Sequence, residues 1–319
     1  MPLSFPDGKR FAFTIFDDTD VASVENLRPI YGLLESLGMR TTKTAWPLPC
    51  PPEGSPDFDT SETLDDPAYR AYVVELQRRG FEIASHGAAM ETSVRARTLE
   101  GLARFNDWFG HFPRLHANHS FNRENLYWGA ERLDDPLLRF LLGRSARGYR
   151  DWYRGHVEGS EWWWGDRCLA HIEYVRNLTF QEVNLLKINP GMPYHDPKRP
   201  LVRWWFSGSD AEGGPEFAEL LNEAAIDRLE REGGVCIVAT HLGKGYVENG
   251  QVLPEVERAL RSLAARPGWF PPTGELLDWM REQRGGATTL PAAEWRAMQW
   301  RWARDLAARK WAGFRARVR

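Results

Sequence analysis

Short apolar runs alternate along the chain with stretches of helical spacing, and this alternation constrains the fold more than any other feature. The runs predict strands at Arg10–Phe16, Thr41–Ala45, Phe81–Ser85, Arg114–Ala117, Asn184–Ile188, Val202–Phe206 and Val235–Ala239. Helices are predicted at Val24–Leu37, Pro67–Arg79 and Pro215–Arg231, each followed by a glycine suited to a helix end. Strands that alternate with helices indicate an α/β protein with a mainly parallel sheet, as a barrel or a doubly wound sheet.

The composition is that of a folded protein without an overall charge bias. Forty-two per cent of the residues are hydrophobic, and 41 basic against 44 acidic residues give a net charge of −3. This balance favours neither a disordered chain nor binding to nucleic acid. Cys50, Cys168 and Cys236 are too few and too scattered for a disulfide framework. Because residues 1–10 carry no apolar leader and no long apolar run follows, we expect a cytoplasmic protein without a transmembrane segment.

One domain is expected over residues 1–290, with an appended helix over 291–319. Two long irregular loops, 46–66 and 143–165, interrupt the alternation, and the second is rich in tryptophan, which predicts that it packs as a lid. Trp295, Met298, Trp302 and Leu306 recur at helical spacing in the basic C-terminal segment. Such a helix can lie on a membrane or bind a partner, but docking on its own domain is the commoner arrangement.

Metal-competent side chains follow four of the predicted strands. They are Asp17, Asp18 and Asp20 after the first, His86 after the third, His116 and His119 after the fourth, and His241 after the last. Taken singly, the aspartates could cap the next helix and each histidine could be structural. Because the carboxyl ends of parallel strands share one rim, the four together predict a mixed oxygen and nitrogen metal site.

Residues 14–18, with the sequence TIFDD, resemble the opening T-F-D-D motif of the polysaccharide deacetylases, also called the NodB-homology family or carbohydrate esterase family 4. His86 and the strand that ends before His241 extend the resemblance over about residues 10–245. It implies a distorted (β/α)7 barrel that binds a divalent metal and hydrolyses acetamido groups on sugars. It further implies Asp17 as general base, Asp18 and His86 as metal ligands, and His241 as general acid.

The sequence departs from the family at two motifs. The family's second motif ends in a histidine four residues after the first, and Met90 stands there, whose thioether is a poor ligand for such a cation. The arginine of the third motif is also missing from the segment that contains His116 and His119. We therefore predict that His119 supplies the third ligand, because it lies furthest toward the loop, with His116 in reserve.

The expected activity is removal of an N-acetyl or other acyl group from an amino sugar in polysaccharide or glycoconjugate biosynthesis, with one divalent ion, by expectation zinc or another transition metal. Residues predicted to contact the sugar are His116, Asn118, Trp46, Trp163 and Asp210. Indole rings can stack on sugars, although packing in the core would explain them equally well. The alternative function is a carbohydrate-binding protein on the same fold that has lost its metal and its activity, for which Met90 is the main argument.

Overall fold

The computed structural model describes residues 3–49, 61–144, 151–286 and 289–318. In this part of the chain the strands are β1 (Phe11–Asp17), β2 (Thr42–Ala45), β3 (Glu82–Ser85), β4 (Leu115–Ala117), β5 (Tyr174–Phe180), β6 (Trp204–Asp210), β7 (Val235–Thr240), the hairpin strands β8 (Val247–Glu248) and β9 (Gln251–Val252), and β10 (Gly268–Trp269). Strands β1 to β7 pair in chain order, all in parallel, and β1 also pairs with β7. The sheet is thus a closed seven-stranded barrel, which confirms the predicted (β/α)7 fold.

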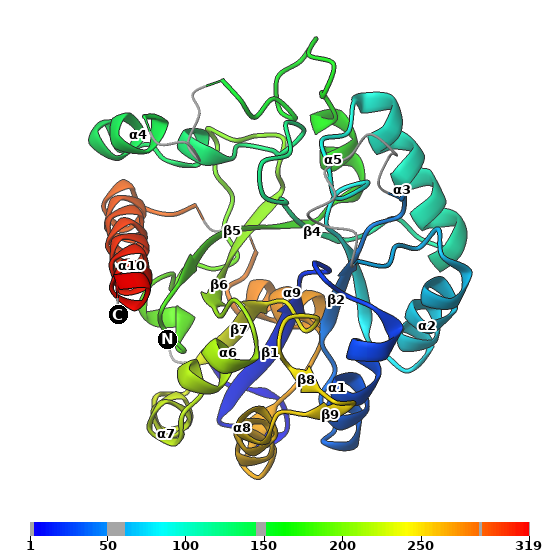
Figure 1. Cartoon of the computed structure of the whole chain (residues 1–319). Coiled ribbons are helices and arrows are strands. Elements are labelled where there is room, and N and C mark those ends of the chain that lie inside the picture. The colour runs from blue at the N-terminus through cyan, green and yellow to red at the C-terminus, as the bar shows by residue number, and fades with distance from the viewer. Residues whose placement is uncertain (1–2, 50–60, 145–150, 287–288, 319) are drawn as a thin grey trace.

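Helices surround this barrel (Figure 1). They are α1 (Val24–Ser36), α2 (Pro67–Arg78), α3 (Arg95–Phe109), α4 (Pro136–Gly143), α5 (Gly165–His171), α6 (Gly214–Leu220), α7 (Glu223–Glu232), α8 (Pro254–Ala264), α9 (Thr273–Gln283) and α10 (Ala292–Val318), with short 3-10 turns η1 (Pro6–Gly8), η3 (Gly129–Arg132) and η4 (Leu185–Lys187). Gly38, Gly80 and Gly233 have positive φ at the helix ends. Their left-handed conformation is the one that glycine adopts without strain.

Two sequence predictions of secondary structure are wrong. The run Asn184–Ile188 contains the 3-10 turn η4 instead of a strand, because the Asn184 side chain accepts a hydrogen bond from the backbone of Leu186 and turns the chain. The strand at this place is β5, whose polar residues Arg176 and Asn177 break the apolar pattern. Helix Pro215–Arg231 is in fact two helices, because Asn222 caps a new helix, α7.

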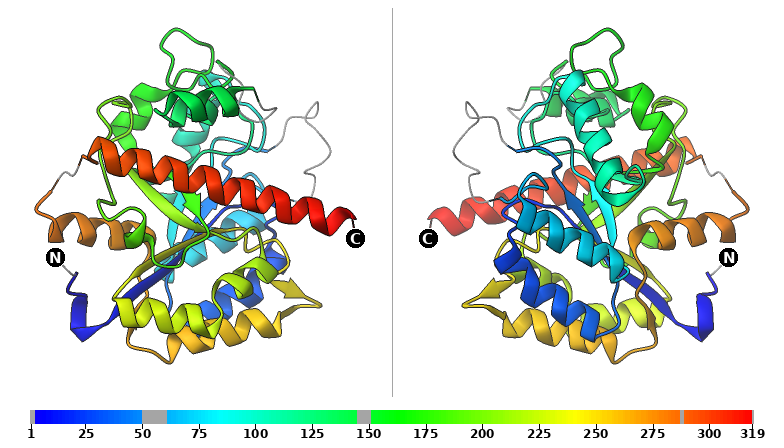
Figure 2. Two further views of the ribbon diagram at one scale, coloured as in Figure 1. Left: turned by 90° about the vertical axis from the view of Figure 1, so that its left-hand side faces the viewer. Right: turned by 90° about the vertical axis from the view of Figure 1, so that its right-hand side faces the viewer.

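Helix α10 lies across one side of the barrel (Figure 2). Its residues Trp295, Met298 and Trp302 are buried, and they pack with residues of β5 and β6 in one apolar cluster. Between β5 and β6 the described chain forms only the short turn η4, so α10 covers a part of the barrel that the connection leaves open. No helix among the described residues is long and apolar enough to cross a bilayer.

The two predicted long loops are described only in part, since residues 50–60 and 145–150, including Cys50, lie outside the described residues. Cys168 and Cys236 are buried free thiols. In the second loop Trp164 is buried and its Nε1–H donates to the carbonyl oxygen of Glu124, over 2.7 Å. The described part of this loop therefore packs on the segment that follows β4.

The side chains of β1 point alternately toward the helices and toward the inside of the barrel, and this decides which way the aspartate at its end points. Phe13 and Ile15 pack in a cluster with residues of α1, whereas Phe16 packs in a second cluster with Phe206 of β6. Successive side chains of a strand point to opposite faces. Odd-numbered residues of β1 therefore face the helices, and the position of Asp17 continues that series.

Candidate metal centre

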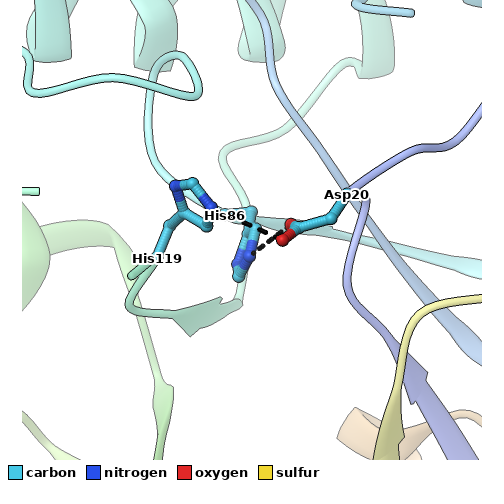
Figure 3. A group of neighbouring side chains, drawn as sticks. All are labelled: Asp20, His86 and His119. Atoms are coloured by element: carbon cyan, nitrogen blue, oxygen red, sulfur yellow. Dashed lines mark ion pairs between the residues drawn. The ribbon is translucent and has the colours of Figure 1, made fainter. Parts of the chain in front are cut away.

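Asp20, His86 and His119 form a buried group at the carboxyl ends of the strands (Figure 3). One ligand atom from each lies within 4.8 Å of the others. Nε2 of His86 is 3.4 Å from Oδ1 of Asp20, and Nε2 of His119 is 3.5 Å from Oδ2 of the same carboxylate. Ligand atoms held about 2.0–2.2 Å from one tetrahedral Zn²⁺ are themselves roughly 3.3–3.5 Å apart. The spacing therefore suits a single cation.

The backbone fixes which nitrogen each imidazole presents. Nδ1–H of His86 donates to the carbonyl oxygen of Ala117 over 3.1 Å, and Nδ1–H of His119 donates to that of Met90 over 2.8 Å. A carbonyl oxygen can only accept, so Nδ1 carries the proton and Nε2 has its lone pair toward Asp20 in the neutral ring. Hydrogen bonds of this kind orient histidine ligands in metal sites.

Burial and neighbouring charges set the protonation of the three side chains, and they favour a neutral His86 and an ionised Asp20. Burial lowers the pKa of His86, which favours the neutral imidazole that a metal binds. In His119 burial acts in the same direction, but the carboxylate of Asp20 outweighs it and raises the pKa. For Asp20 itself burial opposes ionisation, yet the nearby His119 and His86 hold its pKa well below the usual range. Within the described chain, Asp20 Oδ1 is buried and accepts no hydrogen bond, as a ligand atom for a cation would be.

The carboxylate of this group is Asp20 and not Asp18, which the sequence had indicated. Both oxygens of Asp18 accept hydrogen bonds from the guanidinium of Arg176, over 2.9 and 2.5 Å. Burial raises the pKa of Asp18, but Arg176 outweighs burial and lowers it overall. Asp18 is therefore an ionised carboxylate held in a bidentate pair, beside the His86–His119 pair and not between them.

Asp17, the predicted base, lies on the other side of the strand. It is fully buried, and it accepts hydrogen bonds from the Tyr31 hydroxyl and the backbone of Leu242, each over 2.8 Å. Nζ of the fully buried Lys43 is 3.3 Å from its Oδ2. Asp17 is thus enclosed between the barrel and α1, out of contact with solvent, and the cation beside it is Lys43.

Replacing Asp17 by asparagine should therefore destabilise the fold. The change leaves the buried ammonium of Lys43 without its counter-charge, which costs about 3–5 kcal/mol when one member of a buried pair is removed. Urea unfolding of the variant measures this loss, and the double variant Asp17→Asn/Lys43→Met should recover most of it. Loss of turnover with unchanged stability would instead return the role of base to Asp17.

Trp46 was predicted to stack on a sugar, but it lies behind the histidines. It is fully buried, and its Nε1–H donates to the carbonyl oxygen of His86 over 3.1 Å. Its ring stacks on that of His86 with centroids 5.8 Å apart, and it meets the ring of His119 edge-on at 5.1 Å. Trp46 thus packs against both imidazoles, and it is not among the described residues that line the cavity beside them.

A cavity of about 460 Å³ opens beside the group. Among its lining residues are Asp18, Asp20, His86, Asn118, His119, Trp128, Arg132, Tyr153, Arg176, Asn177, Asp210, Glu212, His241, Lys244, Trp302 and Arg309. This volume lies within the range of about 300–1,000 Å³ that is usual for small-molecule sites. Helix α10 contributes to the cavity wall through Trp302 and Arg309, so the docked helix is part of the site.

Of the residues predicted to bind substrate, Asn118 and Asp210 line this cavity, whereas His116 and Trp163 are not among the described residues that line it. His116 is buried and bonds to the Ser85 hydroxyl over 3.1 Å and to Asn118 over 3.3 Å. Burial lowers its pKa to about 3, so it is a neutral structural residue. It does not share the position of His119.

The predicted acid His241 does reach the cavity. Its Nδ1–H donates to the carbonyl oxygen of Glu212 over 2.8 Å, so Nε2 faces the acidic side chains. Nε2 is 3.6 Å from Asp20 Oδ2 and 4.0 Å from Asp18 Oδ2. His86, His119 and His241 are thus all bonded through Nδ1 to the backbone, and all three direct Nε2 toward the carboxylate of Asp20.

Sequence reasoning missed Arg176 and Lys244. The family's third motif has an arginine that the segment after β4 lacks, and the arginine that pairs with Asp18 here lies on β5. Nζ of Lys244 is 3.7 Å from Asp20 Oδ2 and 2.8 Å from Glu212. Alternation in residues 174–180, with the sequence YVRNLTF, was the signal for Arg176, because a strand pattern that continues through an arginine places the cation on one of its faces.

The sequence matches no protein-family model, and no curated protein matches it closely enough to count as a relative. Among solved structures, a candidate polysaccharide deacetylase from Mycobacterium smegmatis superposes with a TM-score of 0.52 at 13% identity, over 91% of this chain and 96% of the other. The chain has the polysaccharide deacetylase fold. The resemblance read from the motifs is therefore confirmed for the fold.

The deacetylase fold is also that of the PuuE allantoinase, which superposes with a TM-score of 0.51 at 12% identity, over 87% of this chain and 92% of the other. One barrel thus occurs in proteins named for different substrates. A fold alone does not determine the reaction, so the activity has to be argued from the side chains of the site.

Proposed function

We propose that this protein is a metal-dependent hydrolase that removes an acetyl or another acyl group from the nitrogen of an amino sugar. The arrangement around Asp20 carries the proposal. It combines a donor set that suits one divalent cation with a second, ionised carboxylate and a third imidazole in the same cavity. These are the groups that amide hydrolysis requires: an electrophile site, a base and an acid.

Asp20, His86 and His119 are the residues that would hold the metal. A divalent ion there supplies Lewis acidity to the carbonyl group of the amide. The donor set of one carboxylate and two imidazoles is suited to zinc and to other divalent transition metals. Zinc remains our first expectation.

Asp18 is the proposed base. Arg176 keeps it ionised and fixes both its oxygens, so that it can take a proton from the attacking water without first turning. This assigns to Asp18 and Asp20 the roles that the sequence had indicated for Asp17 and Asp18. The functional pair of aspartates is separated by Thr19 instead of being adjacent.

His241 is the proposed acid. Its Nδ1–H is engaged with the backbone, so protonation at Nε2 gives an imidazolium whose second proton points into the cavity. Transfer of that proton to the departing nitrogen avoids an amide anion as leaving group, and general acid catalysis of this kind contributes about 10²–10⁴-fold.

The alternative, a binding protein without metal or activity, rested on Met90. In the structure Met90 contributes its backbone carbonyl to His119, and His119 lies with Asp20 and His86 in a group that could hold a metal ion. A binding protein would have no need for a carboxylate in a bidentate pair and an oriented imidazole beside such a group. The enzyme is therefore the function that we favour.

Acetate release tests the proposal. The purified protein, loaded with Zn²⁺, should release acetate from at least one member of a panel of free, phosphorylated and nucleotide-linked N-acetylhexosamines, and a chelator should stop the reaction. Proton NMR detects acetate for all substrates alike. A protein that binds no divalent ion on titration, and releases no acetate or other acid from the panel, would support the binding protein instead.

A further inference from the structure

The cavity contains a cation whose charge is not balanced by the protein. Three of the cations that line it have carboxylate partners: Arg176 pairs with Asp18, Lys244 with Glu212, and Arg309 with Asp210. Arg132 has no carboxylate partner among the residues that the structure describes. It lies at the end of η3, in the segment between β4 and β5.

Arg132 is buried and held by two indole rings. Arg132 is only 7% exposed. Its guanidinium carbon lies 3.4 Å from the ring centroid of Trp128 and 5.4 Å from that of Trp302. Its Nε is buried and has no hydrogen-bond partner in the described chain. Burial lowers its pKa to about 9. A buried charge without a counter-charge is unfavourable unless a ligand supplies one.

A second residue of the same cavity, Asn177, has a side-chain oxygen without a hydrogen-bond partner in the described chain. The amide of Asn177, on β5, donates from Nδ2 to the Tyr194 hydroxyl over 3.2 Å, while its Oδ1 is buried and accepts no hydrogen bond from the described residues. Asn177 and Arg132 both line the cavity. Buried polar groups are rarely left unsatisfied in native proteins, so the two groups together indicate a polar ligand in this cavity.

We propose that the cavity accepts a substrate with an anionic substituent, a carboxylate or a phosphate, and that Arg132 binds it. This inference rests on the proposed function for the identity of the reacting group, but not for the anion. The planar guanidinium matches carboxylate and phosphate oxygens with two parallel hydrogen bonds. Stacking on Trp128 fixes its plane in advance, which reduces the entropy lost on binding. The substrate class is then an acidic or phosphorylated amino sugar.

Binding of small anions tests this without any turnover. Inorganic phosphate and glucuronate are titrated into the zinc-loaded protein, with glucose as the neutral probe, for wild type and for Arg132→Gln. Hydrogen bonds to a charged group predict that the variant binds the preferred anion about 10- to 100-fold more weakly. Arg132→Lys should bind with intermediate affinity, and the two probes separate a phosphate site from a carboxylate site.

Arg139→Gln is the matched control. Arg139 lies on α4, pairs with Glu131 and is not among the described residues that line the cavity. This variant loses the same charge, so it should bind the anions like wild type. If Arg132→Gln binds both anions as wild type does, or if binding is lost only in Asp20→Ala, the anions bind at the metal and the inference is overturned.

Stability provides a second readout. If Arg132 is retained for a ligand, its replacement by glutamine should leave the thermal midpoint in the absence of anion equal or higher, because an uncompensated buried charge is removed. A clearly lower midpoint would mean that the stacked guanidinium is structural, which contradicts the proposal. Anion binding that depends on Arg132 without any release of acetate would refute the proposed hydrolase alone; acetate release with anion binding independent of Arg132 would refute only this inference.

Discussion

Replacing Asp20 by alanine should remove both the bound metal and the activity. The two remaining imidazoles, His86 and His119, would have to hold a cation alone, without the negative charge that lies 3.4 and 3.5 Å from their Nε2 atoms. We expect elemental analysis to show a fall from one divalent ion per chain to nearly none. Loss of the several kcal/mol that the ion contributes corresponds to a decrease of about 10³-fold or more in turnover.

Asp210→Ala is the matched control for this variant. It removes a carboxylate from the same cavity, but Asp210 accepts a hydrogen bond from Thr179 over 2.9 Å and pairs with Arg309, away from the imidazole group. This variant should retain the metal. If Asp20→Ala keeps its metal while Asp18→Ala loses it, the ligand is Asp18, as the motif had indicated, and the assignment made from the geometry is wrong.

Replacing Asp18 by asparagine should give the opposite combination, with metal retained and turnover lost. Asparagine has nearly the same shape but cannot accept the proton of the attacking water, so turnover should fall by about 10²–10⁴-fold, the usual contribution of a general base. Elemental analysis and acetate release, measured on the same preparation, separate the two effects. Turnover at the wild-type rate would exclude Asp18 as the base.

The partner of Asp18 complicates this variant, because Arg176 is itself buried and would lose its counter-charge. A destabilised protein could lose activity for that reason alone. The double variant Asp18→Asn/Arg176→Met removes both charges and serves as the control. It should regain stability without regaining turnover, whereas recovery of turnover would mean that Asp18 acts only by neutralising Arg176.

The alternation of strands and helices predicted an α/β protein, as a barrel or a doubly wound sheet, and the family resemblance then indicated the barrel that the structure has. The sequence pattern placed β5 wrongly for a physical reason. Strand β5 carries Arg176 and Asn177, which both line the cavity where the register between β5 and β6 shifts. An apolar-run criterion passes over a strand with polar residues at its centre. The nearby apolar residues of 185–188 were taken for the strand instead. The polar residues that line the cavity are therefore the reason why β5 was missed.

The sequence indicated the strand ends that form the site, but it assigned the roles to the wrong aspartates. The candidate residues do lie at the ends of the strands. The position of His119 toward the loop favoured it over His116, and in the structure His119 is the one that lies beside Asp20 and His86. The aspartates were assigned by motif alone, although alternation along β1 places Asp17 with Phe13 and Ile15 on the helix-facing side. Arg132 could not have been found from sequence, since only the packing of Trp128 and Trp302 shows that its charge is buried.

The location of the metal is the central claim, and anomalous scattering from crystals of the zinc-loaded protein locates it directly. Data collected above and below the zinc absorption edge should give one strong difference peak, about 2.0–2.2 Å from a carboxylate oxygen of Asp20 and from Nε2 of both His86 and His119. A peak coordinated by Asp18 or His116, or crystals soaked in zinc that show no peak in the cavity, would contradict the account.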